Sequence, residues 1–378
     1  MPHPAALCEE SRQAIPQRFP FLTSLIFAAK HKMGYKLAMT QAHSGIQPLQ
    51  VGIIGDGAMG TLCALLLAEC GHSVQLWGRQ SQRVMELRTD RQNRRYLPGI
   101  TLPESVQLTD QDTAVASRAD FLICAVPTQY IRSILQRLAP HIPAGLPIVS
   151  VAKGIENQTL LRPTQIILDV LPDRSVAALS GPCIAGEAAR RMPATLVAAS
   201  SDHGLATRVQ QVMTTRSVRI YRNADLTGVE LAGATKNVIA IAAGVLDGMN
   251  MGVNAKAALL TRGLVEITRL GMAMGAQAET FSGLAGLGDL VTTCFSQEGR
   301  NRGFGQQIGQ GVGPEQAMAA MTGVVEGAAT TRSVLELAQR HKVEMPISEM
   351  LYSVLFRAKP PVAAITELMS RQLKAELT

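Results

Sequence analysis

The stretch VGIIGDGAMG, residues 51–60, decides the fold of this 378-residue chain. It places Gly55, Gly57 and Gly60 in the spacing G-x-G-x-x-G, directly after an apolar run and before a helical pattern that reaches Cys70. In a strand–turn–helix unit, the first glycine permits the tight turn, the second lets the backbone approach a pyrophosphate, and the third lets the helix pack on the strand. The helix N-terminus would face the anion. We therefore predict a dinucleotide site here, with a chance glycine turn as the alternative.

The second predicted strand bears on the choice of dinucleotide. It covers SVQLWG, residues 73–78, and ends without the Asp or Glu that binds the 2′-hydroxyl of NAD. Arg79 follows at once, and Arg83 comes four residues later. An arginine can accept a 2′-phosphate, although either side chain could equally be a solvated surface arginine. The sequence therefore leaves both NADP and NAD open as the cofactor.

Short apolar runs alternate with helical patterns from residue 49 to about residue 226. Further runs of this series lie at 120–127, 146–154, 175–182 and 194–200. Such alternation is typical of a parallel sheet with helices on both faces. The remainder is helical, and Thr227 to Glu230 has the form of a capping box at its start. We predict the α/β class: an N-terminal Rossmann-like doubly wound sheet (49–226), followed by an all-α C-terminal domain (227–378) for substrate and catalysis.

Residues 1–48 differ from the rest of the chain. They are mixed polar, contain five prolines and carry one short apolar patch, FLTSLIFAA. A weak targeting signal is one interpretation of this segment. We expect instead a poorly ordered extension with no fold of its own.

The composition restricts the class of function. Charged residues make up 17% of the chain and hydrophobic residues 47%, which indicates a globular protein. Aromatic residues are scarce, at 4%, and no basic block is longer than Arg94-Arg95, so we expect no nucleic-acid partner. The net charge of +7 suits a small anionic substrate. No apolar run looks long enough to cross a bilayer, so we expect no stable membrane insertion. The six cysteines form no CxxC pair, which favours reduced thiols in the cytoplasm and no metal site.

One lysine stands out in the helical half. In LAGATKNVIAIAAG, residues 231–244, Lys236 shares its helix face with apolar residues alone. Those residues are Val229, Ala232, Gly233, Ile239, Ala240 and Ala243. A lone lysine commonly extends to the surface. We favour a lysine that lines a cofactor crevice near Asp289, because burial would lower its pKa and a carboxylate would raise it, leaving a usable proton donor.

Other candidate residues follow the predicted strands or lie in a polar loop. Lys153 ends the strand in VSVAKG, and Gly181-Pro182-Cys183 ends the next one. Ligands bind at the carboxyl ends of such strands, although an ordinary surface lysine is the alternative for Lys153. The predicted loop SQEGRNRGFG offers Arg300, Asn301 and Arg302 as a phosphate clamp, or is simply solvated.

Taken together, these segments resemble the bacterial type of NAD(P)-dependent glycerol-3-phosphate dehydrogenase from about residue 50 to the end. The matching motifs, in order, are GIIGDGAMG, VSVAKG, LSGP, GATKNVIAIAAG, GLAGLGDLVTTC, GRNR, VVEG and EMPI. The resemblance implies interconversion of dihydroxyacetone phosphate and sn-glycerol 3-phosphate with NAD(P)(H), supplying glycerol 3-phosphate for phospholipid synthesis.

The resemblance also implies roles for individual residues. It implies that Lys236 is the general acid/base, that Asp289 supports it, and that Lys153 contacts both substrate and cofactor. It implies that Arg300 reaches both the substrate phosphate and the cofactor. The other implied substrate contacts are Gly181, Cys183, Asn237, Thr293, Gly299 and Asn301. The other implied cofactor contacts are Gly55, Gly57, Ala58, Met59, Gly60, Arg79, Ala185, Val324 and Glu326.

The chain departs from the family pattern at a few of these positions. The family usually has Ser or Asn followed by an aromatic residue where this chain has Ala58 and Met59, so those contacts can be through the backbone only. Cys183 replaces a hydroxyl residue and is a poorer hydrogen-bond partner. Two rival functions stay open: a reductase acting on another acid or nucleotide sugar, and a dinucleotide-sensing protein without turnover. A homodimer is compatible with the sequence.

Overall fold

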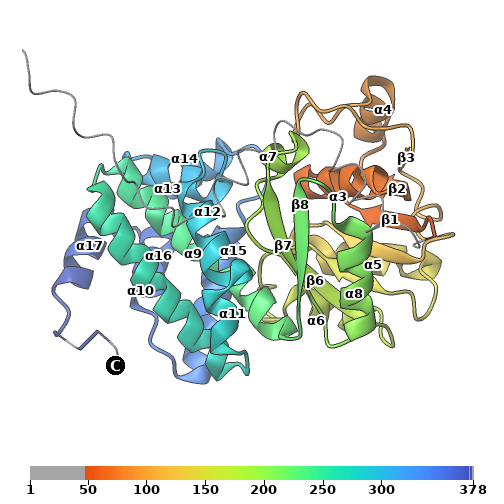
Figure 1. Cartoon of the computed structure of the whole chain (residues 1–378). Helices are drawn as coiled ribbons and strands as arrows, with labels where there is room; N and C mark the ends of the chain where they lie inside the picture. The colour runs from red at the N-terminus through yellow and green to blue at the C-terminus, as the bar shows by residue number, and fades with distance from the viewer. Residues whose placement is uncertain (1–46, 374, 377–378) are drawn as a thin grey trace, which may run out of the picture. The chain divides into compact units, whose positions relative to one another are not determined.

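The computed structural model describes residues 47–373, 375 and 376. The predicted N-terminal extension, with its apolar patch, lies outside the described residues except for Gln47 and Pro48. From Gln47 onward the chain forms one compact unit. Figure 1 shows a sheet-containing half and an all-helical half within it.

One eight-stranded sheet organises the first half, in the order β3-β2-β1-β4-β5-β6-β7-β8. All neighbours are parallel except β6 and β7. The predicted runs became six of these strands, whereas β3 and β8 were not predicted. The strands are β1 (Gln50–Ile54), β2 (Ser73–Trp77), β3 (Val106–Thr109), β4 (Phe121–Cys124), β5 (Ile148–Ser150), β6 (Val176–Ser180), β7 (Ala194–Ala199) and β8 (Val218–Asn223).

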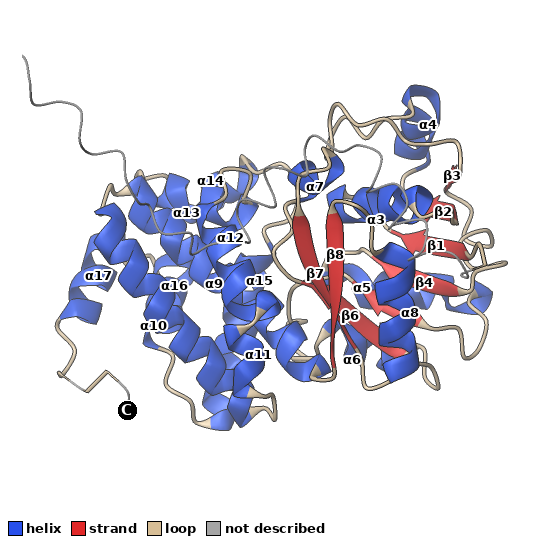
Figure 2. Ribbon diagram, in the orientation of Figure 1, coloured by secondary structure: helices blue, strands red, loops and turns tan. Residues whose placement is uncertain are grey.

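Helices cover both faces of this sheet (Figure 2). One layer is formed by α5 and α6, whose apolar side chains share a core cluster with β1, β2, β4, β5 and β6. On the other face, α3 packs against β1 and β2, and α8 packs against β6, β7 and β8. The doubly wound class is therefore confirmed. The helices are α3 (Ala58–Glu69), α4 (Ser81–Asp90), α5 (Thr128–Leu138), η2 (Ala139–His141), α6 (Pro163–Val170), α7 (Ala185–Ala189) and α8 (His203–Met213).

The second half contains no strand in the described residues after Asn223, as predicted. Its core is built around α9, which is buried along most of its length. Its elements are α9 (Leu226–Gly248), α10 (Gly252–Ala273), α11 (Ala278–Ser282), the π-helical turn η3 (Leu284–Gly288), α12 (Asp289–Phe295), α13 (Arg300–Gly309), α14 (Pro314–Ala319), α15 (Glu326–His341), α16 (Pro346–Phe356) and α17 (Pro361–Met369).

The start of α9 differs from the predicted capping box. Asp225, not Thr227, is the N-cap, and its carboxylate accepts a hydrogen bond from the Gly228 N–H at 2.8 Å. Glu230 is buried and instead accepts from the backbone and hydroxyl of Thr164 at 2.8 and 2.7 Å. A capping box needs its acid free to turn back to the helix start, and this acid is engaged by α6.

We expected no apolar run long enough to cross a bilayer. This expectation was wrong for α9, whose length and hydropathy taken alone would allow it to do so. Of its most apolar 18-residue window, 89% is buried inside the protein. An apolar helix with this burial is a core helix, because protein rather than lipid covers its side chains.

A buried carboxylate in the helical half generates a stability prediction. Glu266 of α10 accepts from the Ile347 N–H at 2.6 Å at the start of α16, and burial raises its pKa from 4.5 to about 7. Unfolding therefore releases a proton between these two values, so the free energy of unfolding should fall as the pH rises through this window. We expect the fall in the free energy of unfolding over this pH window to be smaller in Glu266→Gln, by up to about 3 kcal/mol. Denaturant titrations at pH 4.5 and 7.5 measure it.

The exposed Glu336 of α15 serves as the matched control for this measurement. Glu336→Gln should leave the pH dependence of the unfolding free energy as it is in the parent chain. An unchanged pH dependence in Glu266→Gln would contradict the prediction.

Candidate active site

The glycine loop lies between β1 and α3 and has an open backbone surface. Gly55 has a φ of +113°, which only glycine adopts readily. A Cβ on Gly60 would lie 1.9 Å from the Gly55 carbonyl oxygen, so this glycine permits the close strand–helix contact. A Cβ on Gly57 would meet nothing within 4 Å, and no side chain caps α3. The first N–H groups of α3 are therefore available to an anion, which is the geometry that a dinucleotide diphosphate requires.

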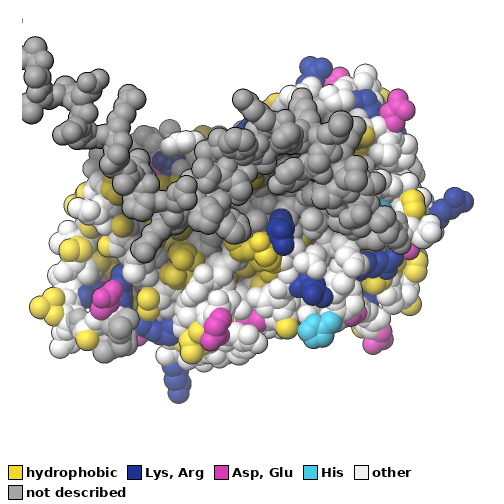
Figure 3. Space-filling view, in the orientation of Figure 1, with side chains coloured by type: hydrophobic (Ala, Val, Ile, Leu, Met, Phe, Trp, Pro, Cys, Tyr) yellow, Lys and Arg dark blue, Asp and Glu magenta, His cyan; other side chains and the backbone are white. Residues whose placement is uncertain are grey.

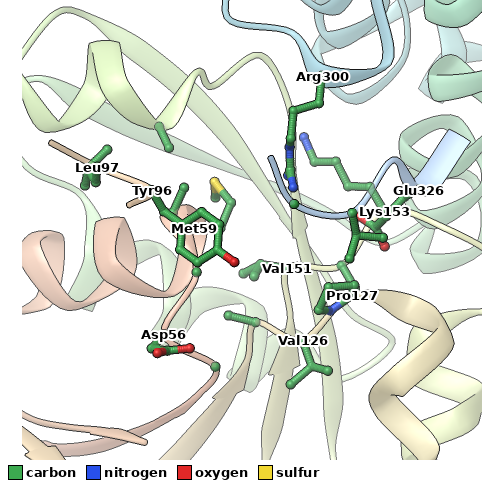
Figure 4. Close-up of a pocket in the computed structure, with 18 of the residues that line it drawn as sticks. Asp56, Met59, Tyr96, Leu97, Val126, Pro127, Val151, Lys153, Arg300 and Glu326 are labelled. Atoms are coloured by element: carbon green, nitrogen blue, oxygen red, sulfur yellow. The ribbon is translucent and has the colours of Figure 1, made fainter. Parts of the chain in front are cut away.

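A cavity of about 810 Å³ opens beside this loop, and residues of both halves line it. It lies at the carboxyl ends of β1, β4 and β5, where the strand order reverses direction. Figure 4 shows Lys153, Arg300 and Glu326 toward one side of it, and Met59 and Tyr96 toward the other. Of the predicted residues, Gly60, Gly181 and Arg302 do not line the cavity. Those that do are Gly55, Gly57, Ala58, Met59, Arg79, Lys153, Cys183, Ala185, Lys236, Asn237, Asp289, Thr293, Gly299, Arg300, Asn301, Val324 and Glu326.

Two lysines share one carboxylate at the centre of the cavity. Lys236 Nζ lies 2.5 Å from Asp289 Oδ1, and Lys153 Nζ lies 2.7 Å from Asp289 Oδ2. Lys236 also donates to Thr293 Oγ1 at 2.5 Å, and Lys153 donates to the Gly181 carbonyl at 3.1 Å. Each ammonium group has three donors, of which the described residues take two. One N–H of each lysine is thus left for a ligand in the cavity.

Burial and charge set the protonation of this trio. The Lys236 side chain is 5% exposed and that of Asp289 2%. Burial lowers the pKa of Lys236 from 10.5 to about 8; the Asp289 carboxylate opposes this shift, and the Lys153 ammonium adds to it. Burial alone would raise the pKa of Asp289, but the two ammonium groups lower it below its ordinary value. Lys236 can therefore exchange a proton near neutral pH while Asp289 stays ionised.

Local backbone geometry places Asp289 at this point. The π-helical turn η3 precedes it, and a Cβ on Gly286 would lie 2.0 Å from the Phe281 carbonyl oxygen, so only glycine fits. Asp289 is the first residue of α12, and Thr293 follows one turn later on the same face. Cys183 lines the same cavity, and burial raises the pKa of its thiol to about 11, so the thiol is neutral.

The predicted polar loop is partly helical. Gly299 is the N-cap of α13, and Arg300 and Asn301 form its first turn. The Asn301 amide oxygen accepts from the Gly327 N–H at 3.0 Å, which leaves its NH₂ group as the donor toward the cavity. Arg300 makes no ion pair with a carboxylate of the described residues. Arg302 is instead buried on the far side of the helix and does not line the cavity, so it is not part of the predicted clamp.

The far end of the cavity carries Arg83, a predicted candidate for a 2′-phosphate, together with Arg95 and Tyr96, which the sequence analysis did not assign to a site. Tyr96 lines it, with the Arg83 guanidinium 4.9 Å and the Arg95 guanidinium 5.4 Å from the ring centroid. Arg83 also pairs with Asp56 of the glycine loop at 3.0 Å. The sequence feature that could have indicated this end of the cavity is the run RRYLPG, in which basic and aromatic residues lie together between two predicted strands. The end beyond the glycine loop is thus basic and aromatic, as a nucleoside or its phosphate requires.

Two further contacts join the halves beside the cavity. Glu326, at the start of α15, accepts from the N–H and the hydroxyl of Thr128 at the start of α5, at 2.9 and 3.0 Å. The Asn237 NH₂ group donates to the Lys153 carbonyl at 2.9 Å. These bonds fix the helical half against the ends of β4 and β5.

The described residues of one face carry side chains of mixed charge (Figure 3). Figure 3 shows Lys and Arg side chains scattered among acidic and apolar ones on the face in view, outside the part that undescribed residues cover. A nucleic-acid surface would gather such cations into one patch.

Comparison with known proteins agrees with this geometry. The profile of the NAD-dependent glycerol-3-phosphate dehydrogenase N-terminus matches residues 50–206, and that of the C-terminus matches residues 225–366. The chain is 48% identical over 331 residues to glycerol-3-phosphate dehydrogenase [NAD(P)+] of Geobacter sp. (strain M21), covering 86% of this chain and 98% of that protein. The protein of the same name from Geobacter sulfurreducens is 47% identical over 330 residues, with the same coverage.

A solved structure gives the same result. The crystal structure of glycerol-3-phosphate dehydrogenase from Coxiella burnetii superimposes with a TM-score of 0.83 at 36% identity, covering 86% of this chain and 99% of that one. Both halves of the described chain therefore have a counterpart in that structure. This chain belongs to the NAD-dependent glycerol-3-phosphate dehydrogenase family of oxidoreductases, whose cofactor is NAD(P).

Proposed function

We propose that this chain interconverts dihydroxyacetone phosphate and sn-glycerol 3-phosphate by hydride transfer with NAD(P)(H). The observation that carries the proposal is that the buried Lys236 and the partly buried Lys153 share Asp289, each with one donor left, beside an anion-binding glycine loop. The product, glycerol 3-phosphate, would supply phospholipid synthesis. The names of the relatives support this substrate.

The glycine loop would hold the diphosphate of the coenzyme, with Ala58 and Met59 contributing backbone N–H groups. The reduced nicotinamide, when bound, supplies the hydride that reaches C2 of the substrate. Arg79, Ala185 and Val324 line the same cavity and would contact the coenzyme.

Lys236 would act as the general acid in the direction of reduction. Its free N–H would give a proton to the carbonyl oxygen, and Asp289 and Thr293 would hold the ammonium group in place. In the direction of oxidation the neutral amine would take the hydroxyl proton. Lys153 would donate its own free N–H to the same oxygen and polarise the carbonyl bond.

The first turn of α13 would bind the substrate phosphate. Arg300 offers a guanidinium fork, Asn301 an NH₂ group, and the helix N-terminus further N–H donors. Gly299 gives close access to that terminus. Asn237 and Cys183 line the space between this clamp and the lysines and would contact the glycerol carbons and hydroxyls, while the Gly181 carbonyl orients Lys153.

This assignment gives the two domains different roles. We propose that residues 49–226 bind the coenzyme and that residues 227–378 supply the catalytic lysine and the phosphate clamp. We also propose that the protein acts in the cytoplasm and assembles as a homodimer. Free thiols at all five described cysteines are in keeping with the cytoplasm.

The activity is tested by loss of nicotinamide absorbance when dihydroxyacetone phosphate is added, with NADH and NADPH in turn. We expect Lys236→Met to lower kcat by about 10²- to 10⁴-fold with an unchanged KM for the coenzyme, because it removes proton transfer alone. Lys359→Met, at an outlying ion pair, is the control.

Two results would contradict this proposal. Near-normal turnover of Lys236→Met would remove the role of that lysine. Activity confined to non-phosphorylated carbonyls, or coenzyme binding without turnover, would favour one of the two rival functions.

The pH dependence of turnover follows from the lowered pKa of Lys236, about 8. Reduction needs the protonated amine, so its kcat should fall as the pH rises through about 8. Oxidation needs the neutral amine, so its kcat should rise over the same range. Asp289→Asn removes the carboxylate that raises this pKa and should move both inflections to lower pH. Identical profiles for the two chains would show that another group titrates.

The phosphate clamp is tested with a pair of substrates that differ in the phosphate alone. Arg300→Ala should raise KM for dihydroxyacetone phosphate by about 10- to 100-fold, the loss of a charge-assisted hydrogen bond, and leave turnover of dihydroxyacetone unchanged. Arg340→Ala, at an exposed pair on α15, is the matched control. Equal losses on both substrates would exclude a phosphate role for Arg300.

A further inference from the structure

Helices α9 and α13 contact one another through their backbones. A Cβ on Gly244 of α9 would lie 2.0 Å from the Arg302 carbonyl oxygen, and one on Gly248 would lie 2.2 Å from that of Gln306. On α13, a Cβ on Gly305 would lie 2.0 Å from the Ile241 carbonyl oxygen. Glycines spaced four residues apart on each helix therefore bring the two axes as close as the backbones allow. The helix of the catalytic lysine and the helix of the phosphate clamp are one packed unit.

A partly buried polar cluster joins the same two helices near the clamp. Asp247 of α9 accepts from Arg302 Nε at 2.6 Å and from Lys256 Nζ at 2.9 and 2.8 Å. Arg302 also donates to the Gln297 side chain at 3.0 Å, in the loop that leads to the clamp. We call Asp247, Lys256, Gln297 and Arg302 the Asp247 cluster. The Arg302 and Lys256 side chains are each 9% exposed.

The Asp247 cluster also reaches two further helices, α10 and α12. Lys256 comes from α10, and its ammonium lies 4.6 Å from the ring centroid of Phe295, the last residue of the α12 helix that Asp289 begins. Arg302 is two residues from Arg300 along α13. No member of the cluster lines the cavity, so none would touch a substrate there.

Backbone contact by glycines fixes how close two helices are but resists rotation and sliding poorly, because it offers no interlocking side chains. The partly buried Asp247 carboxylate is bonded to two buried cations and resists both motions, since any shift would leave a buried charge unpaired. The carbonyl and the phosphate of a three-carbon ester are only a few bonds apart. A small shift of α13 against α9 would therefore separate the clamp from Lys236 by more than the substrate can span.

We propose that the Asp247 cluster is a positioning device that holds Arg300 and Asn301 at the distance from Lys236 that a three-carbon phosphate ester requires. This inference rests on the proposed phosphate clamp. It assigns Asp247 and Arg302 to substrate specificity, although neither contacts the substrate.

The test uses the full-length chain with Asp247→Asn and Arg302→Met. We expect KM for dihydroxyacetone phosphate to rise by about 10- to 100-fold, whereas the inhibition constant of inorganic phosphate, which binds the clamp alone and does not span the distance to Lys236, should stay unchanged. The KM for the coenzyme and the inflection of kcat near pH 8 should stay unchanged, because neither Lys236 nor the glycine loop is touched. Arg302→Lys keeps the positive charge and should recover part of the loss.

Glu230→Gln is the matched control, because it weakens another buried ion pair of α9, with Arg162, far from the clamp. Glu230→Gln should lower the stability of the protein without changing the ratio of the KM for dihydroxyacetone phosphate to the KM for the coenzyme. Should Asp247→Asn fail to fold, the comparison of Arg302→Met with Arg302→Lys decides, since the two variants differ in whether the positive charge beside Asp247 is kept. A parallel change in the KM for substrate and coenzyme, or no change in either, would overturn the proposal.

Failure of this inference can be told apart from failure of the proposed function. If Arg300→Ala leaves KM for dihydroxyacetone phosphate unchanged, the clamp itself is wrong, and with it the proposal. If Arg300→Ala raises that KM while the Asp247 and Arg302 variants do not, the clamp stands and only the positioning role is overturned.

Discussion

The Asp289 carboxylate is the interaction on which the rest of the site depends. Each of its oxygens holds one lysine, Lys236 or Lys153, and the side chains of Asp289 and Lys236 are almost completely buried. Burying a lone ammonium group costs several kcal/mol, so neither lysine would stay in the cavity without this partner. The same carboxylate keeps the pKa of Lys236 from falling further than about 8. The Asp289 carboxylate therefore both balances the charge of the two lysines and sets the pKa at which Lys236 would transfer a proton.

The fold serves this interaction by bringing three separate elements to one point. The loop that follows β5 carries Lys153, the middle of α9 carries Lys236, and the first residue of α12 is Asp289. The parallel sheet supplies an edge at which strand ends and the anion-binding start of α3 meet. The all-helical half supplies close glycine contacts between α9 and α13, which bring the phosphate clamp near the catalytic lysine.

Predictions from local patterns failed where a distant element competed for the same side chain. Glu230 fits a capping box by spacing, yet α6 engages it, and Asp225 caps α9 instead. The loop that contains Arg302 has the composition of a phosphate clamp, yet Arg302 donates a hydrogen bond to Asp247 between α9 and α13 and is not in the cavity. Strands β3 and β8 were missed because both are edge strands of the sheet with polar residues among the apolar ones. Tyr96 was missed because its neighbours in space come from other parts of the chain.

The amino-acid sequence alone determined the glycine turn, the alternation of strands and helices and the apolar face around Lys236, because these depend on residues within one or two turns of each other. Only the tertiary structure decided which partner each charge has. Lys236 and Asp289 are 53 residues apart, and Lys153 and Asp289 are 136 apart. A carboxylate's partner depends on which elements the packing brings within hydrogen-bond distance, and no local pattern encodes that distance.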